Sequence, residues 1–212
     1  MTAVTAAAGL AVAGCAPLKM GAAATVGSNA ISVATLTNDT GTLQSAGKSY
    51  GSAYTLTSQQ ATQATLTWLI RFKINDQLAS NAGLTITQSD VTGALTDIGA
   101  EAEQDNVKLD EFLVTNGVAP SLIPEVGRWE AINLAFLKQA NGGSLPTSAT
   151  SPAETKLTSA TCEAAKSLNI AVNPQFGRMS YTQYTVVNTP DSVSRASGTK
   201  QTASIAGQYP AC

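Results

Sequence analysis

The sequence predicts a mainly helical fold of the α+β class, with four to six helices and a small sheet formed from short strands near both ends of the chain. Three observations support this prediction. Several segments place apolar residues three and four positions apart, which is the spacing of one helix face, and helix-capping residues flank them. Short β-prone runs occur near both ends of the chain. Apolar residues make up 43% of the 212 residues, enough for one buried core.

The predicted strands lie on either side of the helices in the sequence. Residues 22–27 (AAATVG) and 30–33 (AISV) flank a polar pair and predict either two very short strands or a strand and a turn. Near the other end, β-prone runs occur within IAVNPQFGRM and YTQYTVVN. From residue 189 onward the tail is polar and rich in Ser, Thr and Gly, so we expect it to be poorly ordered.

The strongest predicted helix covers residues 58–80. Ser58 is suited to be its N-cap, and Gly83 follows its end, where glycine commonly terminates helices. Apolar residues recur along it at helical spacing. They are Leu66, Leu69, Ile70, Ile74 and Leu78.

Five further segments have weaker helical signals. Thr87 followed by Asp90 predicts a helix start of the capping-box kind. Ser121 is expected to cap a later helix that carries Pro124 in its first turn, where proline is tolerated. The five segments are residues 34–48, 85–104, 108–117, 122–141 and 152–169. Residues 142–152 form a linker by composition.

The composition excludes several classes of function. The chain has no histidine, which rules out a Ser-His-Asp triad, a Cys-His pair and any zinc site with a histidine ligand, and three cysteines cannot form a four-cysteine zinc site. A net charge of −2 without a long run of one sign gives no electrostatic footprint for nucleic acid. We therefore expect no enzyme activity, no catalytic residues, no metal, no cofactor and no nucleic-acid partner.

The N-terminal segment has the features of an export signal. Residues 3–14 are apolar or small, like the core of a signal peptide, and are too few for a membrane span, which needs about 20 residues. The sequence VAGC, which ends at Cys15, resembles the bacterial lipobox, in which signal peptidase cuts before an invariant cysteine whose thiol carries a diacylglyceryl group. No Lys or Arg precedes the apolar run, although signal peptides ordinarily begin with positive charge.

The lipobox resemblance implies a location. Residues 1–14 would be a signal peptide that is removed, and residues 15–21 a lipidated tether that holds the protein at the extracytoplasmic face of the cell membrane. An ordinary signal peptide, or a helix that happens to contain a cysteine, is the alternative. If Cys15 carries lipid, Cys162 and Cys212 remain as a candidate disulfide in an oxidising compartment, with two free thiols as the alternative.

The order of segments over roughly residues 20–180 resembles the SurA N-terminal domain family. The resemblance is carried by AAATVGSNAISVATL, LASNAGLTITQSDV, LVTNGVAPSLIPEVGRWEAI and AAKSLNIAVNPQFGRM. The subgroup that it resembles most is the lipid-anchored, SurA-like proteins of Gram-positive actinobacteria. It implies one helical domain over residues 22–188, followed by a polar tail over residues 189–212.

The family resemblance also implies a function. Such domains are chaperone-like or foldase-like and hold unfolded or exported polypeptides in hydrophobic grooves without chemistry. Many relatives carry a parvulin-type prolyl isomerase domain as well, but residues 142–152 leave no room for one, and the histidines of its site are missing. Prolyl isomerase activity is therefore not expected. A structural or ligand-binding cell-envelope lipoprotein with a closed helical core is the alternative function.

A groove for polypeptides would need large apolar side chains that are partly exposed. Four aromatic residues on predicted helices are candidates for client binding, and filling the helical core is their alternative role. They are Trp68, Phe72, Trp129 and Phe136.

The charged residues are expected on solvated surfaces. Arg71, Lys73 and Arg128 would lie on solvated helix faces, with contact to an acidic client or to lipid head groups as the alternative. The acidic residues between positions 97 and 111 would also be solvated, with acid–base chemistry or calcium binding as the alternative. The sequence Asn-Asp-Thr around Asp39 matches a glycosylation acceptor in form but is expected to be only a turn.

Overall fold

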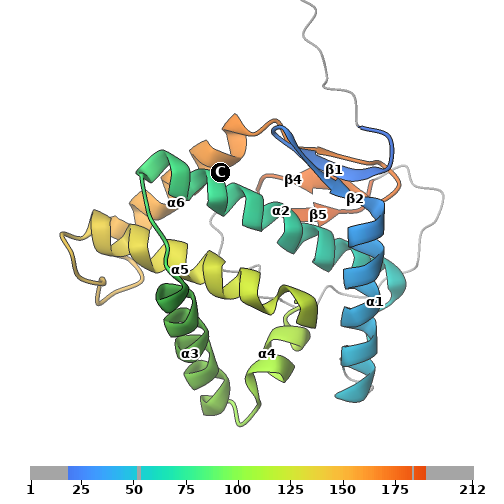
Figure 1. The fold of residues 1–212 in the computed structure, drawn as a ribbon, viewed down its shortest axis with the longest axis horizontal. Helices are drawn as coiled ribbons and strands as arrows, with labels where there is room; N and C mark the ends of the chain where they lie inside the picture. Colours follow the sequence, from blue (N-terminus) through green and yellow to red (C-terminus); the bar gives the residue numbers. More distant parts are fainter. Residues whose placement is uncertain (1–18, 52–53, 183, 190–212) are drawn as a thin grey trace, which may run out of the picture.

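The computed structural model describes residues 19–51, 54–182 and 184–189 (Figure 1). The predicted fold class is confirmed: 62% of the structure is helical, with small antiparallel sheets of short strands near both ends of the chain. The predicted signal peptide, most of the tether with Cys15, and residues 190–212 of the tail with Cys212 lie outside the described residues.

The elements follow the order that the sequence predicts. The first half of the fold contains β1 (Ala22–Val26), β2 (Asn29–Ser32), α1 (Val33–Ser49), α2 (Ser58–Ala82) and α3 (Gln88–Gln104). The second half contains α4 (Leu109–Thr115), the 3₁₀ turn η2 (Pro120–Leu122), α5 (Ile123–Ala140), α6 (Pro152–Ser167), β3 (Ala171–Val172), β4 (Arg178–Ser180) and β5 (Thr185–Val187).

The larger sheet joins the two ends of the domain. β1 lies between β2 and β3 and pairs antiparallel with both, and the smaller sheet pairs β4 with β5. The hairpin β1–β2 turns at Gly27 and Ser28, and Gly27 takes φ = 58°, a left-handed conformation that glycine adopts without steric cost. Of the two predicted arrangements for this segment, the pair of short strands is therefore the correct one.

The long helix α2 runs through the middle of the molecule (Figure 1). Its N-cap is Thr57, not Ser58 as predicted, because Thr57 and Gln60 form a reciprocal capping box. Its C-cap is Gly83 in the left-handed conformation, with φ = 64°, as predicted.

Two apolar cores lie on different sides of α2, and residues of α2 contribute to both. The first, which we call the sheet core, gathers side chains from the strands, α1, α2 and α6, among them Ala24, Val26, Ile31, Leu36, Leu66, Ile70, Ile74, Leu78, Ala164 and Val186. The second, the helix core, gathers side chains from α1, α2, α4 and α5, among them Leu43, Ala61, Trp68, Phe72, Leu113, Val118, Val126 and Trp129. Because both sides of α2 are covered, this helix is buried around most of its circumference.

Polar residues of α2 bind the backbone at β5. The hydroxyl of Thr67 accepts a hydrogen bond from the Val186 amide at 2.9 Å, and Arg71 Nε donates to the Tyr184 carbonyl at 3.1 Å. Arg71 is only 2% exposed, and its guanidinium lies over the Trp68 ring at 5.2 Å. The prediction that Arg71 lies on a solvated face is therefore wrong, because Arg71 is buried and binds the backbone carbonyl of Tyr184, just before β5.

The helices α3, α4 and α5 form a triangle on one side of α2 (Figure 1). The capping box of Thr87 and Asp90 is present at the start of α3, as predicted, and its hydrogen bonds lower the pKa of the Asp90 carboxyl. The predicted capping role of Ser121 is wrong, because Ser121 lies within η2 and α5 begins without a side-chain cap. Pro124 does lie in the first turn of α5.

Candidate functional site

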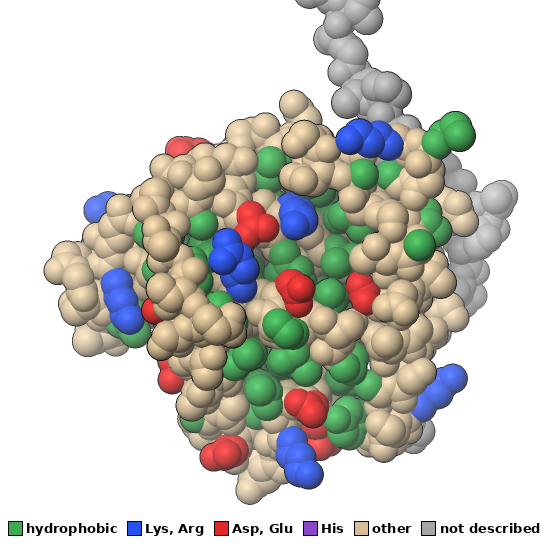
Figure 2. All heavy atoms as spheres, viewed as in Figure 1, with side chains coloured by type: hydrophobic (Ala, Val, Ile, Leu, Met, Phe, Trp, Pro, Cys, Tyr) green, Lys and Arg blue, Asp and Glu red, His purple; other side chains and the backbone are tan. Residues whose placement is uncertain are grey.

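A cavity of about 460 Å³ opens between α1, α2 and α5, beside β2. Figure 2 looks onto this face: apolar side chains gather in the hollow, and acidic and basic side chains surround them. The volume is within the range of about 300–1,000 Å³ that is usual for ligand pockets. This cavity is the candidate site.

The floor of the cavity is apolar. Leu69 and Phe72 come from α2, while Trp129 and Ile132 come from α5, and each pair is three residues apart and so shares one helix face. Ile31 of β2 and Leu122 of η2 complete the floor. Phe72 and Trp129 are only 8% and 7% exposed, so a small part of each residue contacts the cavity while most of its surface stays in the helix core.

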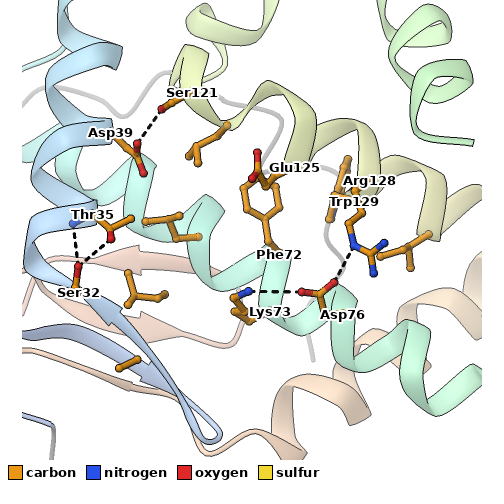
Figure 3. A pocket seen from close by; sticks show the side chains of 15 residues that line it. Ser32, Thr35, Asp39, Phe72, Lys73, Asp76, Ser121, Glu125, Arg128 and Trp129 are labelled. Atoms are coloured by element: carbon orange, nitrogen blue, oxygen red, sulfur yellow. Dashed lines mark hydrogen bonds and ion pairs between the residues drawn. The ribbon is translucent and has the colours of Figure 1, made fainter. Parts of the chain in front are cut away.

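One side of the cavity carries a charged network that centres on Asp76 (Figure 3). Arg128 Nε donates to Asp76 Oδ1 at 3.1 Å, and Lys73 Nζ lies 3.6 Å from Asp76 Oδ2. The three side chains are between 41% and 46% exposed, so water screens these ion pairs and they contribute little to stability. Lys73 and Arg128 are partly exposed, but they line the cavity and do not lie on an open helix face.

The other side of the cavity is acidic (Figure 3). Asp39 of α1 is 5% exposed, and its Oδ1 accepts hydrogen bonds from Ser121 Oγ at 2.8 Å and from Asn38 Nδ2 at 3.3 Å. Glu125 of α5 lines the same cavity and is exposed. The expectation that Asp39 belongs to a turn is wrong: it lies inside α1, whose N-cap is Ser32.

Three of the four predicted client-binding residues meet. The Trp68 ring lies 5.8 Å from the Phe72 ring and 5.5 Å from the Trp129 ring, which it meets edge to face. Trp68 Nε1 donates to the Asn116 carbonyl at 3.4 Å. Phe136 lies apart from them, half-buried against the sheet core. The role of these residues in client binding stays a prediction.

A smaller cavity of about 180 Å³ lies within the triangle of α3, α4 and α5 and shares Trp129 with the first. Its lining includes the carboxylates of Asp97, Glu101 and Glu130. Desolvation raises the pKa of Glu130, and the nearby acidic residues raise it further, while a hydrogen bond from Asn133 opposes the shift. Within the described parts of the chain, no group of three or more His, Cys, Asp or Glu residues is suited to hold a metal ion.

Of the three cysteines, the structure describes only Cys162. Cys162 is half-buried on α6 against the sheet core, while Cys212 and Cys15 lie outside the described residues, so both the disulfide and the lipidation stay predictions. None of the helices in the described ranges is both long and apolar enough to span a bilayer.

The sequence interpretation missed the acidic half of the site. Asp39 and Ser121 are distant in the sequence but form a hydrogen bond. The sequence patterns around them predict a turn at Asp39 and a helix cap at Ser121, and neither prediction indicates this contact. The one available signal was the clustering of polar residues at positions that a helix over residues 34–48 would turn inward.

No family model matches the chain, and no curated protein or solved structure matches it. The resemblance to the SurA N-terminal domain family therefore remains a prediction that rests on the sequence segments quoted above.

Proposed function

We propose that this protein is a membrane-anchored, extracytoplasmic, chaperone-like lipoprotein that binds apolar segments of unfolded or exported polypeptides without catalysis. The observation that carries the proposal is the cavity between α1, α2 and α5, with its apolar floor and charged surroundings. An open hollow of this kind can hold apolar side chains while the polar backbone of the bound segment stays near water.

The size of the cavity supports weak and reversible binding. Burying one side chain such as Leu or Phe contributes roughly 1.5–3 kcal/mol. A cavity of about 460 Å³ accommodates only a few such side chains, and ordering the bound segment offsets part of the gain. Weak binding without chemistry suits a protein that must release its client.

The proposed anchor explains where this binding would be useful. Two or more acyl chains on Cys15 would hold the domain stably at the membrane, whereas a single chain would give only marginal attachment. The domain would then stay within reach of polypeptides that leave the cell.

Suppression of aggregation tests the proposal. The probe is insulin whose B chain aggregates after reduction, with the protein added in stoichiometric excess. The substitution Leu69→Gln places a polar group on the cavity floor and should weaken suppression several-fold. Leu157→Gln is the matched control, since Leu157 is a half-buried helical leucine against the sheet core that does not line this cavity, and it should retain suppression. If the unaltered protein leaves aggregation unchanged, the proposal is wrong.

The low exposure of the aromatic residues favours a second candidate, a structural or ligand-binding cell-envelope lipoprotein with a closed helical core. Phe72 and Trp129 expose less than a tenth of their surface. The same assay separates the two candidates, because a protein with a closed core would not suppress aggregation, with or without Leu69→Gln.

The anchor has a separate test. Mass spectrometry of the protein isolated from membranes should show a diacylglyceryl group on Cys15, and Cys15→Ser should abolish both the modification and membrane association. An unmodified Cys15 in the unaltered protein would contradict the anchor and leave the cavity proposal standing.

A further inference from the structure

We propose that the cavity selects polypeptide segments in which a lysine lies beside apolar residues, and that Asp39 receives the lysine ammonium group. This inference rests on the proposed function and specifies the chemistry of the bound segment.

Only one of the two carboxylate oxygens of Asp39 accepts hydrogen bonds from described residues. Its Oδ1 accepts hydrogen bonds from Ser121 and Asn38, while no described residue donates to its Oδ2. Asp39 lines the cavity, and its Oδ2, unlike several polar atoms elsewhere in the described residues, is not both fully buried and without a partner. One acceptor atom of a residue that is 95% buried is thus available to a ligand.

The charges of the cavity favour a cation at this position. Among the described residues, the two ion pairs in the cavity join Asp76 to Lys73 and Asp76 to Arg128. Asp39 and Glu125, on the other side, have no such partner among the described residues. An ammonium group placed at Asp39 would form a charge-assisted hydrogen bond with this carboxylate, which is stronger than a bond between neutral groups.

The geometry selects lysine over arginine. A guanidinium group binds a carboxylate best through two parallel hydrogen bonds, which need both oxygens. Because Ser121 and Asn38 already occupy Oδ1, Asp39 offers a single acceptor, which suits the compact ammonium group of lysine.

The apolar floor accounts for the rest of the segment. Leu122 lines the same cavity as Asp39 and its partner Ser121, so the cavity offers apolar surface together with the acidic group. The four-carbon stem of a lysine can lie on such a surface while its charged end reaches the carboxylate. Neighbouring apolar residues of the segment would then occupy the floor near Phe72 and Trp129.

Two matched peptides test the inference. They are Ac-Ala-Leu-Lys-Phe-Ala-NH2 and the same peptide with norleucine in place of lysine, which keeps the stem and removes the charge. Isothermal titration calorimetry with the full chain should show that the lysine peptide binds about tenfold more tightly, the effect of one hydrogen bond to a charged group. A third peptide with arginine should bind more weakly than the lysine peptide.

Two variants test whether Asp39 causes the preference for the lysine peptide. Asp39→Asn keeps the shape of the side chain and an acceptor for Ser121, and it should reduce the preference for lysine to near unity without changing the affinity for the norleucine peptide. Glu103→Gln, which removes an exposed carboxylate outside the cavity, should keep the preference. If Asp39→Asn fails to fold, the peptide series on the unaltered protein still decides the matter.

The outcomes separate the inference from the proposed function. Equal affinity for the lysine and norleucine peptides, an arginine peptide that binds as tightly as the lysine peptide, or a preference that survives Asp39→Asn would overturn the inference, while binding of the norleucine peptide would still support the proposed function. If the unaltered protein bound none of the peptides, the proposed function would be overturned and the inference with it.

Discussion

The carboxylate of Glu130 lies between α3 and α5, where it is partly removed from water. Asp97 and Glu101 face it from α3, and Glu154 adds a further negative charge from α6. Desolvation and like charges both disfavour the ionised form, so the pKa of Glu130 is raised above its ordinary value of 4.5. In the folded state this residue therefore holds its proton more tightly than in the unfolded chain.

The raised pKa has a consequence for stability against pH. Between pH 4.5 and the pKa of the folded state, the folded protein binds more protons than the unfolded chain, so stability falls as the pH rises. Glu130→Gln removes this loss. We expect the variant to melt at a higher temperature than the unaltered protein at neutral pH, and the difference to shrink below pH 4.5. Thermal unfolding followed by circular dichroism at several pH values measures this.

The control for Glu130→Gln is Glu103→Gln, which removes an exposed carboxylate from α3. The same pH-dependent gain in Glu103→Gln would show that the effect comes from net charge and would contradict the assignment to Glu130.

The packing of α5 on α3 depends on a glycine. A Cβ atom added at Gly127 would lie 2.6 Å from Leu95 Cγ, which is too close for two carbon atoms that are not bonded to each other. Glycine at this position lets the helices approach, at a cost in helix propensity of about 1 kcal/mol relative to alanine. The smaller cavity lies beside this contact, between α3, α4 and α5.

Alanine substitutions at two glycines should therefore have opposite effects. Gly127→Ala should destabilise the protein by about 1–3 kcal/mol, because Leu95 must move or the helices must separate. Gly99→Ala, in α3, meets no atom within 4 Å and should stabilise the protein by up to about 1 kcal/mol. Chemical denaturation measures both values, and a stabilising Gly127→Ala would show that the interface tolerates the methyl group.

At the scale of the whole molecule, α2 couples the two cores. Ile70 points into the sheet core, while Trp68 and Phe72 of the same helix belong to the helix core. Both tryptophans of the chain, Trp68 and Trp129, lie in the helix core. Tryptophan fluorescence therefore reports on one core, and a substitution in the other core tests whether they unfold together.

We expect Ile70→Ala to destabilise the protein by about 2–5 kcal/mol through the cavity that it leaves. If α2 makes the two cores one cooperative unit, the midpoint seen by tryptophan fluorescence should fall by the same amount as the midpoint seen by far-ultraviolet circular dichroism. Two separated transitions would show instead that the cores unfold independently.

The accuracy of the sequence interpretation follows from the range over which each signal acts. The apolar spacing in α2 and the capping box of Thr87 and Asp90 involve residues three or four positions apart, and both predictions are confirmed. The cap at Ser58 is wrong by one position, since Thr57 and Ser58 are both good caps and the partner Gln60 decides between them. Ser121 fails as a cap because the chain forms the 3₁₀ turn η2 there and α5 begins only at Ile123, and the Ser121 hydroxyl instead donates to Asp39, far away in the sequence.

The sequence by itself determined the mainly helical class, the order of the elements and the short strands at both ends, because helix periodicity, capping and turn preference act within a few residues. Only the tertiary structure decided that β1 pairs with β3, that Asp39 meets Ser121, and that Trp129 meets Trp68 while Phe136 lies apart. Such contacts join residues far apart in the chain, and they depend on how the helices pack together, which no local pattern encodes.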